Sequence, residues 1–104
     1  MAWIYLVTAG IFEIIWAFAM KQSVGFTRPV ASAITIITML VSFWLLALAM
    51  KTIPLGTAYI IWTGIGAIGA FAIGIWFLGE PVTPLRLFAA ALIITGLILL
   101  KLAS

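Results

Sequence analysis

The chain has 104 residues, of which 67% are hydrophobic and only 7% are charged. A soluble domain is about half apolar and a quarter charged, so this composition excludes a soluble globular fold and indicates a chain embedded in lipid. The formal charge of +3 comes from five scattered Lys and Arg residues, with no His and no Cys. This pattern argues against a nucleic-acid patch, and it removes disulfides, thiol nucleophiles and any metal or cofactor site built on those ligands.

Four apolar stretches take up nearly the whole sequence, and each is predicted to cross the membrane as a helix. A spanning helix needs roughly 20 apolar residues to cross about 30 Å of hydrocarbon. The predicted spans are residues 2–20, 30–50, 55–78 and 87–100. Because the last is short, either Arg86 and Lys101 at its ends snorkel to the surface or partners shield the helix. The predicted fold is a single all-α integral membrane domain, residues 1–104, with four transmembrane helices.

The first span contains Glu13, the only acid inside a predicted span. An ionisable group at mid-bilayer costs at least about 2.5 kcal/mol and normally faces a cavity or a partner on an ion pathway. A carboxyl in that position can hold either a proton or a cation, and competition of two ligands for one negative charge is the basis of antiport. The alternative is a permanently protonated Glu13 that hydrogen-bonds another helix.

Helical spacing places Gly10 and Trp16 on the same face of the first span as Glu13. Gly10 either leaves space beside the carboxyl group or allows close helix packing. Trp16 supplies either an indole hydrogen-bond donor or a wall of the site.

The second span carries a stripe of hydroxyl groups at Thr35, Thr38 and Ser42. Ser42 is a candidate to orient Glu13 or to bind a donor on a substrate. The alternative is that these side chains bond back to carbonyls of their own helix, as Ser and Thr often do.

Tyr59 and Trp62 share a face of the third span. Their ring faces attract cations and the Tyr hydroxyl can hydrogen-bond a carboxylate, although aromatic residues near the end of a span also serve as interfacial anchors. Gly64 and Gly66 follow in the middle of the span and predict a bend that differs between two states.

The fourth span has no acid, and its small and branched residues form one stripe. We predict that this stripe is a dimer contact, the alternative being packing within the subunit. The stripe consists of Ala89, Leu92, Ile93 and Gly96.

The basic residues are divided almost evenly between the two membrane faces. Lys21, Arg28 and Arg86 lie on one face, and Lys51 and Lys101 lie on the other. Since Lys and Arg in short loops normally hold one face in the cytoplasm, this balance predicts insertion in both orientations and a working unit that pairs opposite orientations.

Three stretches together resemble the small multidrug resistance family along essentially the full chain. They are AGIFE at residues 9–13, PLGTAY at residues 54–59 and IWTGIGA at residues 61–67. Trp16 followed by Ala17, with Lys101 closing the last span, is similar to the guanidinium-exporter branch of that family.

The resemblance implies an antiparallel, dual-topology homodimer in the plasma (inner) membrane of a bacterium. Two copies of Glu13 would face one site, bind substrate and protons, and exchange one guanidinium-type cation for two protons. Trp16 and Ser42 would hydrogen-bond the carboxylates, and Tyr59 and Trp62 would line the site.

Two other functions stay open from the sequence alone. Met39 and Phe43 are candidates for a side portal that admits alkyl tails, which leaves room for a broad exporter of quaternary ammonium or hydrophobic cations. A non-transporting membrane assembly subunit is the alternative from another class, and it predicts that Glu13→Gln is tolerated. An enzyme is disfavoured, because one acid without a second distinct titratable group offers little for bond-breaking chemistry.

Overall fold

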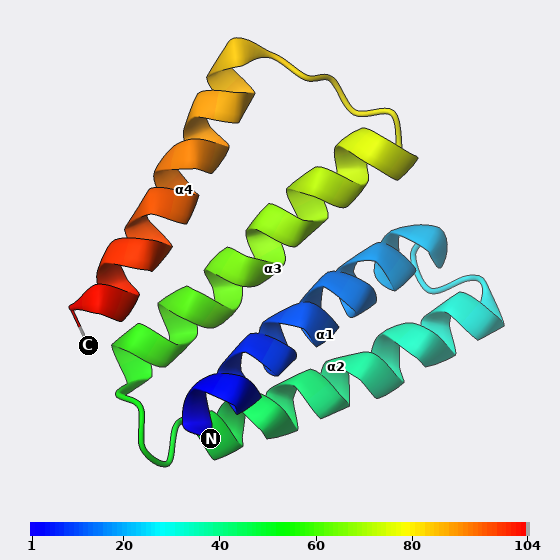
Figure 1. Ribbon diagram of the computed structural model, residues 1–104. Coiled ribbons are helices and arrows are strands. Elements are labelled where there is room, and N and C mark those ends of the chain that lie inside the picture. The colour runs from blue at the N-terminus through cyan, green and yellow to red at the C-terminus, as the bar shows by residue number, and fades with distance from the viewer. Residues whose placement is uncertain (104) are drawn as a thin grey trace.

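The computed structural model describes residues 1–103, which form four α-helices joined by short connections (Figure 1). Each helix is long and apolar enough to cross a membrane. The prediction of an all-α chain with four membrane spans is therefore confirmed at this level. The helices are α1 (Ala2–Gln22), α2 (Pro29–Ala49), α3 (Leu55–Phe77) and α4 (Pro84–Leu102).

The predicted bounds of the fourth span, residues 87–100, are too narrow. Helix α4 has 19 residues, because Thr83 caps it by accepting a hydrogen bond from the Arg86 amide at 3.2 Å and Pro84 occupies its first turn. Proline suits that position, since its fixed φ is helical and its missing N–H would have no helical partner. At 1.5 Å per residue the helix is about 28 Å long, close to the hydrocarbon thickness. The short-span argument for snorkelling therefore falls away, and Arg86 instead lies in the first turn, 3.2 Å from Glu80.

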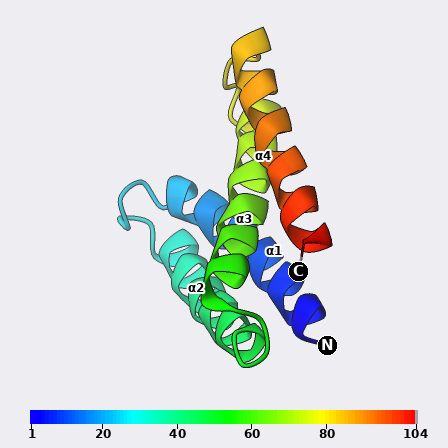
Figure 2. The same cartoon turned by 90° about the vertical axis from the view of Figure 1, so that its left-hand side faces the viewer.

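The helices form a thin layer with α1 between α2 and α3, and α4 on the far side of α3 (Figure 1). The principal extents are 40 × 35 × 16 Å. The arrangement is therefore flat, since its smallest extent is less than half of either of the others. In the view turned by 90°, α3 and α4 are inclined to α1 and α2 (Figure 2). Such a layer does not surround a pathway by itself.

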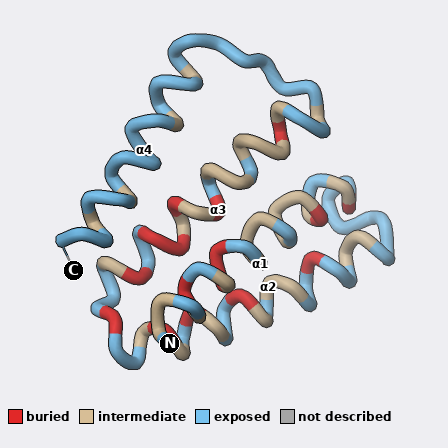
Figure 3. Tube along the Cα trace, in the orientation of Figure 1, coloured by how far each residue is buried: buried red, intermediate tan, exposed pale blue. Residues whose placement is uncertain are grey.

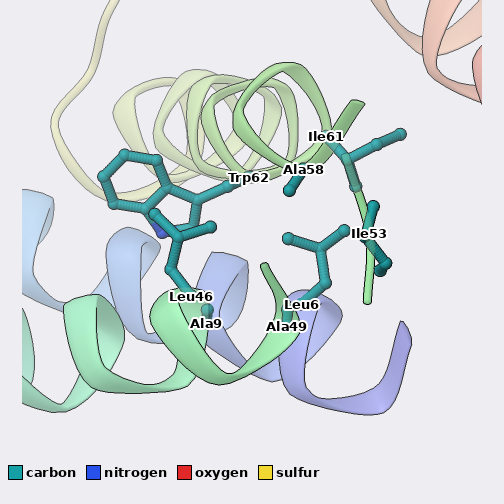
Figure 4. Close-up of a cluster of buried hydrophobic side chains, with 8 residues drawn as sticks. All are labelled: Leu6, Ala9, Leu46, Ala49, Ile53, Ala58, Ile61 and Trp62. Carbon is teal, nitrogen blue, oxygen red and sulfur yellow. The ribbon is translucent and has the colours of Figure 1, made fainter. Parts of the chain in front are cut away.

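Among the described residues, the buried apolar core comes from three of the helices, and Leu97 and Leu100 of α4 pack against its edge. Eight buried residues from α1, from α2 and the turn that follows it, and from α3 form one cluster (Figure 4): Leu6, Ala9, Leu46, Ala49, Ile53, Ala58, Ile61 and Trp62. Among the described residues, none in α4 is buried, and Figure 3 shows most of this helix as exposed. The stripe predicted as a dimer contact, Ala89, Leu92, Ile93 and Gly96, is exposed throughout. Three of these residues, starting at Leu92, line a groove of about 590 Å³ between α3 and α4. The dimer contact itself stays a prediction.

Glycines bring α1 and α3 into close contact. A methyl group on Gly10 would lie 2.7 Å from Cγ2 and 2.8 Å from Cβ of Ile65. Cβ is fixed to the backbone, so Ile65 cannot relieve this overlap by a rotamer change. This contact agrees with the packing interpretation of Gly10, and its place in the lining of the site stays a prediction. Helix α3 runs unbroken through Gly64 and Gly66, and the bend predicted there stays a prediction about a second state.

Replacing Gly10 by Ala should separate α1 from α3. Overpacking of a tight contact costs about 1–3 kcal/mol, so Gly10→Ala should lower the free energy of unfolding by that amount. Gly56→Ala is the matched control, because a methyl group there meets nothing within 4 Å. Unfolding of both variants in mixed detergent micelles, followed by circular dichroism, measures the difference. Equal stability of the two variants would contradict the close contact.

Candidate functional site

Glu13 lies in the middle of α1, and its side chain reaches the backbone of α3 at Gly66. Its side chain is half-buried. A Cβ at position 66 would overlap the Glu13 carboxyl group, so only glycine leaves space for the acid at this point. The sequence predicts a bend at Gly66. The structure shows in addition that the Glu13 carboxyl group packs against the backbone of this glycine.

Two buried polar atoms of residues three positions apart on α1 have no hydrogen-bond partner among residues 1–103. They are Oε1 of Glu13 and Nε1 of Trp16. Buried polar atoms are nearly always paired, because leaving one without a partner costs about 1–3 kcal/mol. One atom is an acceptor and the other a donor, yet they do not bond each other in this structure. The site formed by a single chain is therefore unsatisfied on the face of α1 that carries Glu13.

Ser42 links three helices through its hydroxyl group. The hydroxyl donates to the Ala9 carbonyl of α1 at 2.7 Å and accepts the indole N–H of Trp62 at 2.9 Å. Ala9 is four residues before Glu13, so the same carbonyl is the helical acceptor for the Glu13 amide. In this structure the Ser42 hydroxyl donates its one hydrogen to Ala9, and the hydrogen bond from Ser42 to the Glu13 carboxylates that the family resemblance implies stays a prediction.

The other members of the hydroxyl stripe follow the alternative pattern. Thr35 donates to the Ala31 carbonyl at 2.8 Å, and Thr38 donates to the Ile34 carbonyl at 2.6 Å. Both bonds stay within α2, as is typical of Thr in a membrane helix. Ser42 is thus the member of the stripe that connects α2 to other helices.

Four aromatic rings from three helices form a continuous line that starts one turn after Glu13. Trp16 of α1 meets Phe43 of α2 at 6.5 Å between ring centroids, and Phe43 meets Trp62 of α3 at 5.8 Å. Tyr59 completes the line at 5.6 Å from Trp62. The first two pairs have the edge-to-face arrangement that aromatic pairs prefer, with interplanar angles of 74° and 65°, and the Tyr59–Trp62 pair is tilted at 55°.

The structure thus brings together most of the residues predicted for the site. Trp62 is only 6% exposed, whereas Phe43 and Tyr59 keep 45% and 52% of their surface. Phe43 was predicted as part of a portal, and its position in the middle of the line could not be read from the sequence. Met39 lies half-buried one turn before Phe43 on α2, and its portal function stays a prediction.

The second acid of the chain is already paired. Glu80 lies outside the spans in the α3–α4 connection, with a carboxylate oxygen 3.2 Å from the Arg86 guanidinium. The same guanidinium lies 5.2 Å from the ring centroid of Phe71. Among residues 1–103, Glu13 makes no ion pair, which leaves it as the acid within the spans that has no cationic partner.

Four apolar helices, each long enough to cross a membrane, indicate a multi-pass membrane protein, and among residues 1–103 Glu13 is an acid within these helices that has no ion-pair partner. A family model for the Small Multidrug Resistance protein matches residues 1–93. The guanidinium exporter of Escherichia coli (strain K12) is 53% identical over 104 residues, which cover 100% of this chain and 99% of that protein. The guanidinium exporters of Citrobacter freundii and Salmonella typhimurium are each 51% identical with the same coverage. The chain therefore belongs to the small multidrug resistance family, as the sequence motifs indicate.

Removal of the Ser42 hydroxyl should destabilise the three-helix core. Ser42→Ala leaves the buried Trp62 indole without an acceptor, which should cost about 1–3 kcal/mol of unfolding free energy. Thr38→Val is the control, because its hydroxyl bonds only carbonyls of its own helix. Near-ultraviolet circular dichroism should also report a changed environment of the indole rings in Ser42→Ala alone. A larger loss in Thr38→Val would contradict the bridging function of Ser42.

Proposed function

We propose that this protein exports guanidinium or a small substituted guanidinium across the bacterial inner membrane in exchange for protons. Identity of 51–53% over the full length of proteins named guanidinium exporters supports the substrate. The enterobacterial sources of those relatives support the inner membrane. The observation that carries the mechanism is the buried oxygen of Glu13, which has no partner within the described chain.

The chemistry of the substrate fits a buried carboxylate. Guanidinium is planar and presents N–H donors around its edge, so it can bond a carboxylate through two parallel hydrogen bonds, as an Arg side chain does. A proton on the same carboxyl group removes the charge and turns one of its two acceptor oxygens into an O–H donor, so the paired hydrogen bonds to guanidinium are lost. Proton and guanidinium therefore exclude each other at Glu13. Two such acids at one site would exchange two protons for one cation.

The working unit is proposed to be an antiparallel homodimer. A single chain is a thin layer, and it leaves both the Glu13 oxygen and the Trp16 indole nitrogen without partners. A second, inverted copy would bring another carboxyl group and another indole to the same place. Inverted repeats around a site at the middle of the membrane are a recurrent solution to alternating access. The exposed stripe of α4 from Ala89 to Gly96 supplies a small-residue surface for the contact.

The aromatic line would form the wall of the shared site. Ring faces attract cations by about 0.5–2 kcal/mol, with the larger value where water is excluded. Phe43 and Tyr59 have exposed ring surface, whereas Trp62 is held by its bond to Ser42. Rotation of Phe43 and Met39 would open the side of the site to substituents on larger guanidiniums. Gly64 and Gly66 would allow α3 to bend between the two access states.

Glu13→Gln should abolish coupled transport, because an amide can neither release a proton at neutral pH nor hold a cation by charge. In proteoliposomes with an acidic lumen, protons leave and guanidinium enters, so wild-type protein should accumulate labelled guanidinium. Glu80→Gln is the matched control, since this acid lies outside the spans and already pairs with Arg86. It should keep most of the flux. Full activity of Glu13→Gln, or flux that does not depend on the pH gradient, would sink the proposal.

Dual insertion should be visible with reporters at the C-terminus. A reporter active only in the cytoplasm and one active only outside should both give signal, since the basic residues hardly favour either orientation. Gln22→Lys and Thr52→Lys add one charge to opposite faces and should shift the ratio of the two signals in opposite directions. A signal from one reporter only, unchanged by both substitutions, would exclude the dual-topology arrangement.

A further inference from the structure

A groove of about 310 Å³ lies at the end of the bundle where α1 begins and α4 ends. Three helices contribute a pair of residues four positions apart: Trp3 and Val7 from α1, Ile61 and Ile65 from α3, and Leu97 and Lys101 from α4. A four-residue step rises about 6 Å along a helix, so the walls are continuous over one turn. All of the lining side chains except Lys101 are apolar.

The one charge of this groove is held at its outer end. Lys101 lies in the last turn of α4, and its ammonium nitrogen is 4.3 Å from the ring centroid of Trp3 in the first turn of α1. This cation–π contact fixes the charge beside the groove and leaves the N–H donors of the ammonium group available. Within residues 1–103, Lys101 makes no ion pair. The ends of spanning helices lie at the headgroup level of a bilayer, where Trp and Lys are commonly found.

We propose that this groove binds one acyl chain of an anionic phospholipid, with the headgroup phosphate held by Lys101. The groove is apolar along its length and ends in one cation at the headgroup level. These two parts match the hydrocarbon chain and the phosphate of such a lipid. Basic side chains at this depth attract anionic lipids. This proposal concerns a surface away from Glu13 and does not depend on the transported substrate.

A second copy of the chain is a poorer match for the charge. Its acids are Glu13, in the middle of a span, and Glu80, which is already paired with Arg86. Neither is a free counterion for Lys101. The chain as a whole is cationic, with a formal charge of +3, so another copy brings more positive charge than negative. The lipid phosphate is therefore the occupant that complements the groove.

Native mass spectrometry of the full-length protein, titrated with phosphatidylglycerol, tests the proposal. Lys101→Gln should weaken retention of this lipid about fivefold, the contribution of one basic residue near a membrane surface. Lys101→Arg should keep most of it. Lys51→Gln is the matched control, because Lys51 is exposed on the same membrane face and does not line the groove. It should bind like the wild type.

The remaining arms separate lipid binding from simpler explanations. Zwitterionic phosphatidylcholine should be retained less well than phosphatidylglycerol. Glycerophosphoglycerol, which has the headgroup and no acyl chains, should not be retained. Equal loss in Lys51→Gln and Lys101→Gln, equal retention of both lipids, or tight binding of the chain-free headgroup would overturn the proposal.

Discussion

The molecule depends on one constraint, the position of the Glu13 carboxyl group. This ionisable group lies where water is scarce, and residues 1–103 supply no cationic partner for it. Glu13 fits against α3 only because position 66 has no side chain, and α1 approaches α3 only because position 10 has none. The two glycines therefore set the distance between the helix that carries the acid and the helix that carries the rings of Tyr59 and Trp62. A bulkier residue at either point changes the geometry of the acid as well as the packing.

The Ser42 hydroxyl forms a polar bridge inside the apolar core, and this bridge fixes the orientation of Trp62 in the line of aromatic rings. The indole of Trp62 is tied to α2 through Ser42, and Ser42 is tied to the Ala9 carbonyl of α1, one turn before Glu13. Both bonds are buried, so breaking either exposes an unsatisfied group to a low-dielectric interior. The same hydroxyl thus connects the backbone beside the acid to the ring wall of the site. Any movement of α1 that carries Glu13 must also strain or release Trp62.

The sequence predicts the architecture well because the bilayer imposes a length and an apolar composition on each span. Glu13 and the aromatic residues stand out for the same reason, since polar and amphipathic groups are rare in lipid. Three features could not be derived in this way. Ser42, Thr35 and Thr38 look alike in sequence, and only packing decides that Ser42 crosses to other helices. The start of α4 depends on a local cap at Thr83, and Phe43 joins the ring line through a contact between distant segments.

Charge and packing together favour an inverted partner over a parallel one. In a parallel pair, one membrane surface would hold six basic side chains and the other four, the same three-to-two ratio as in a single chain. An inverted pair places five on each surface and removes any preference. In the proposed inverted dimer, the face of α1 that bears Glu13 and Trp16 would lie toward the same face of the other copy, where the unpaired Glu13 oxygens and Trp16 indole nitrogens would meet. Helix α4 has no buried residue within its own chain, and the second copy would cover its exposed face. The features that a single chain leaves unsatisfied are thus those that a two-fold axis in the membrane plane would pair.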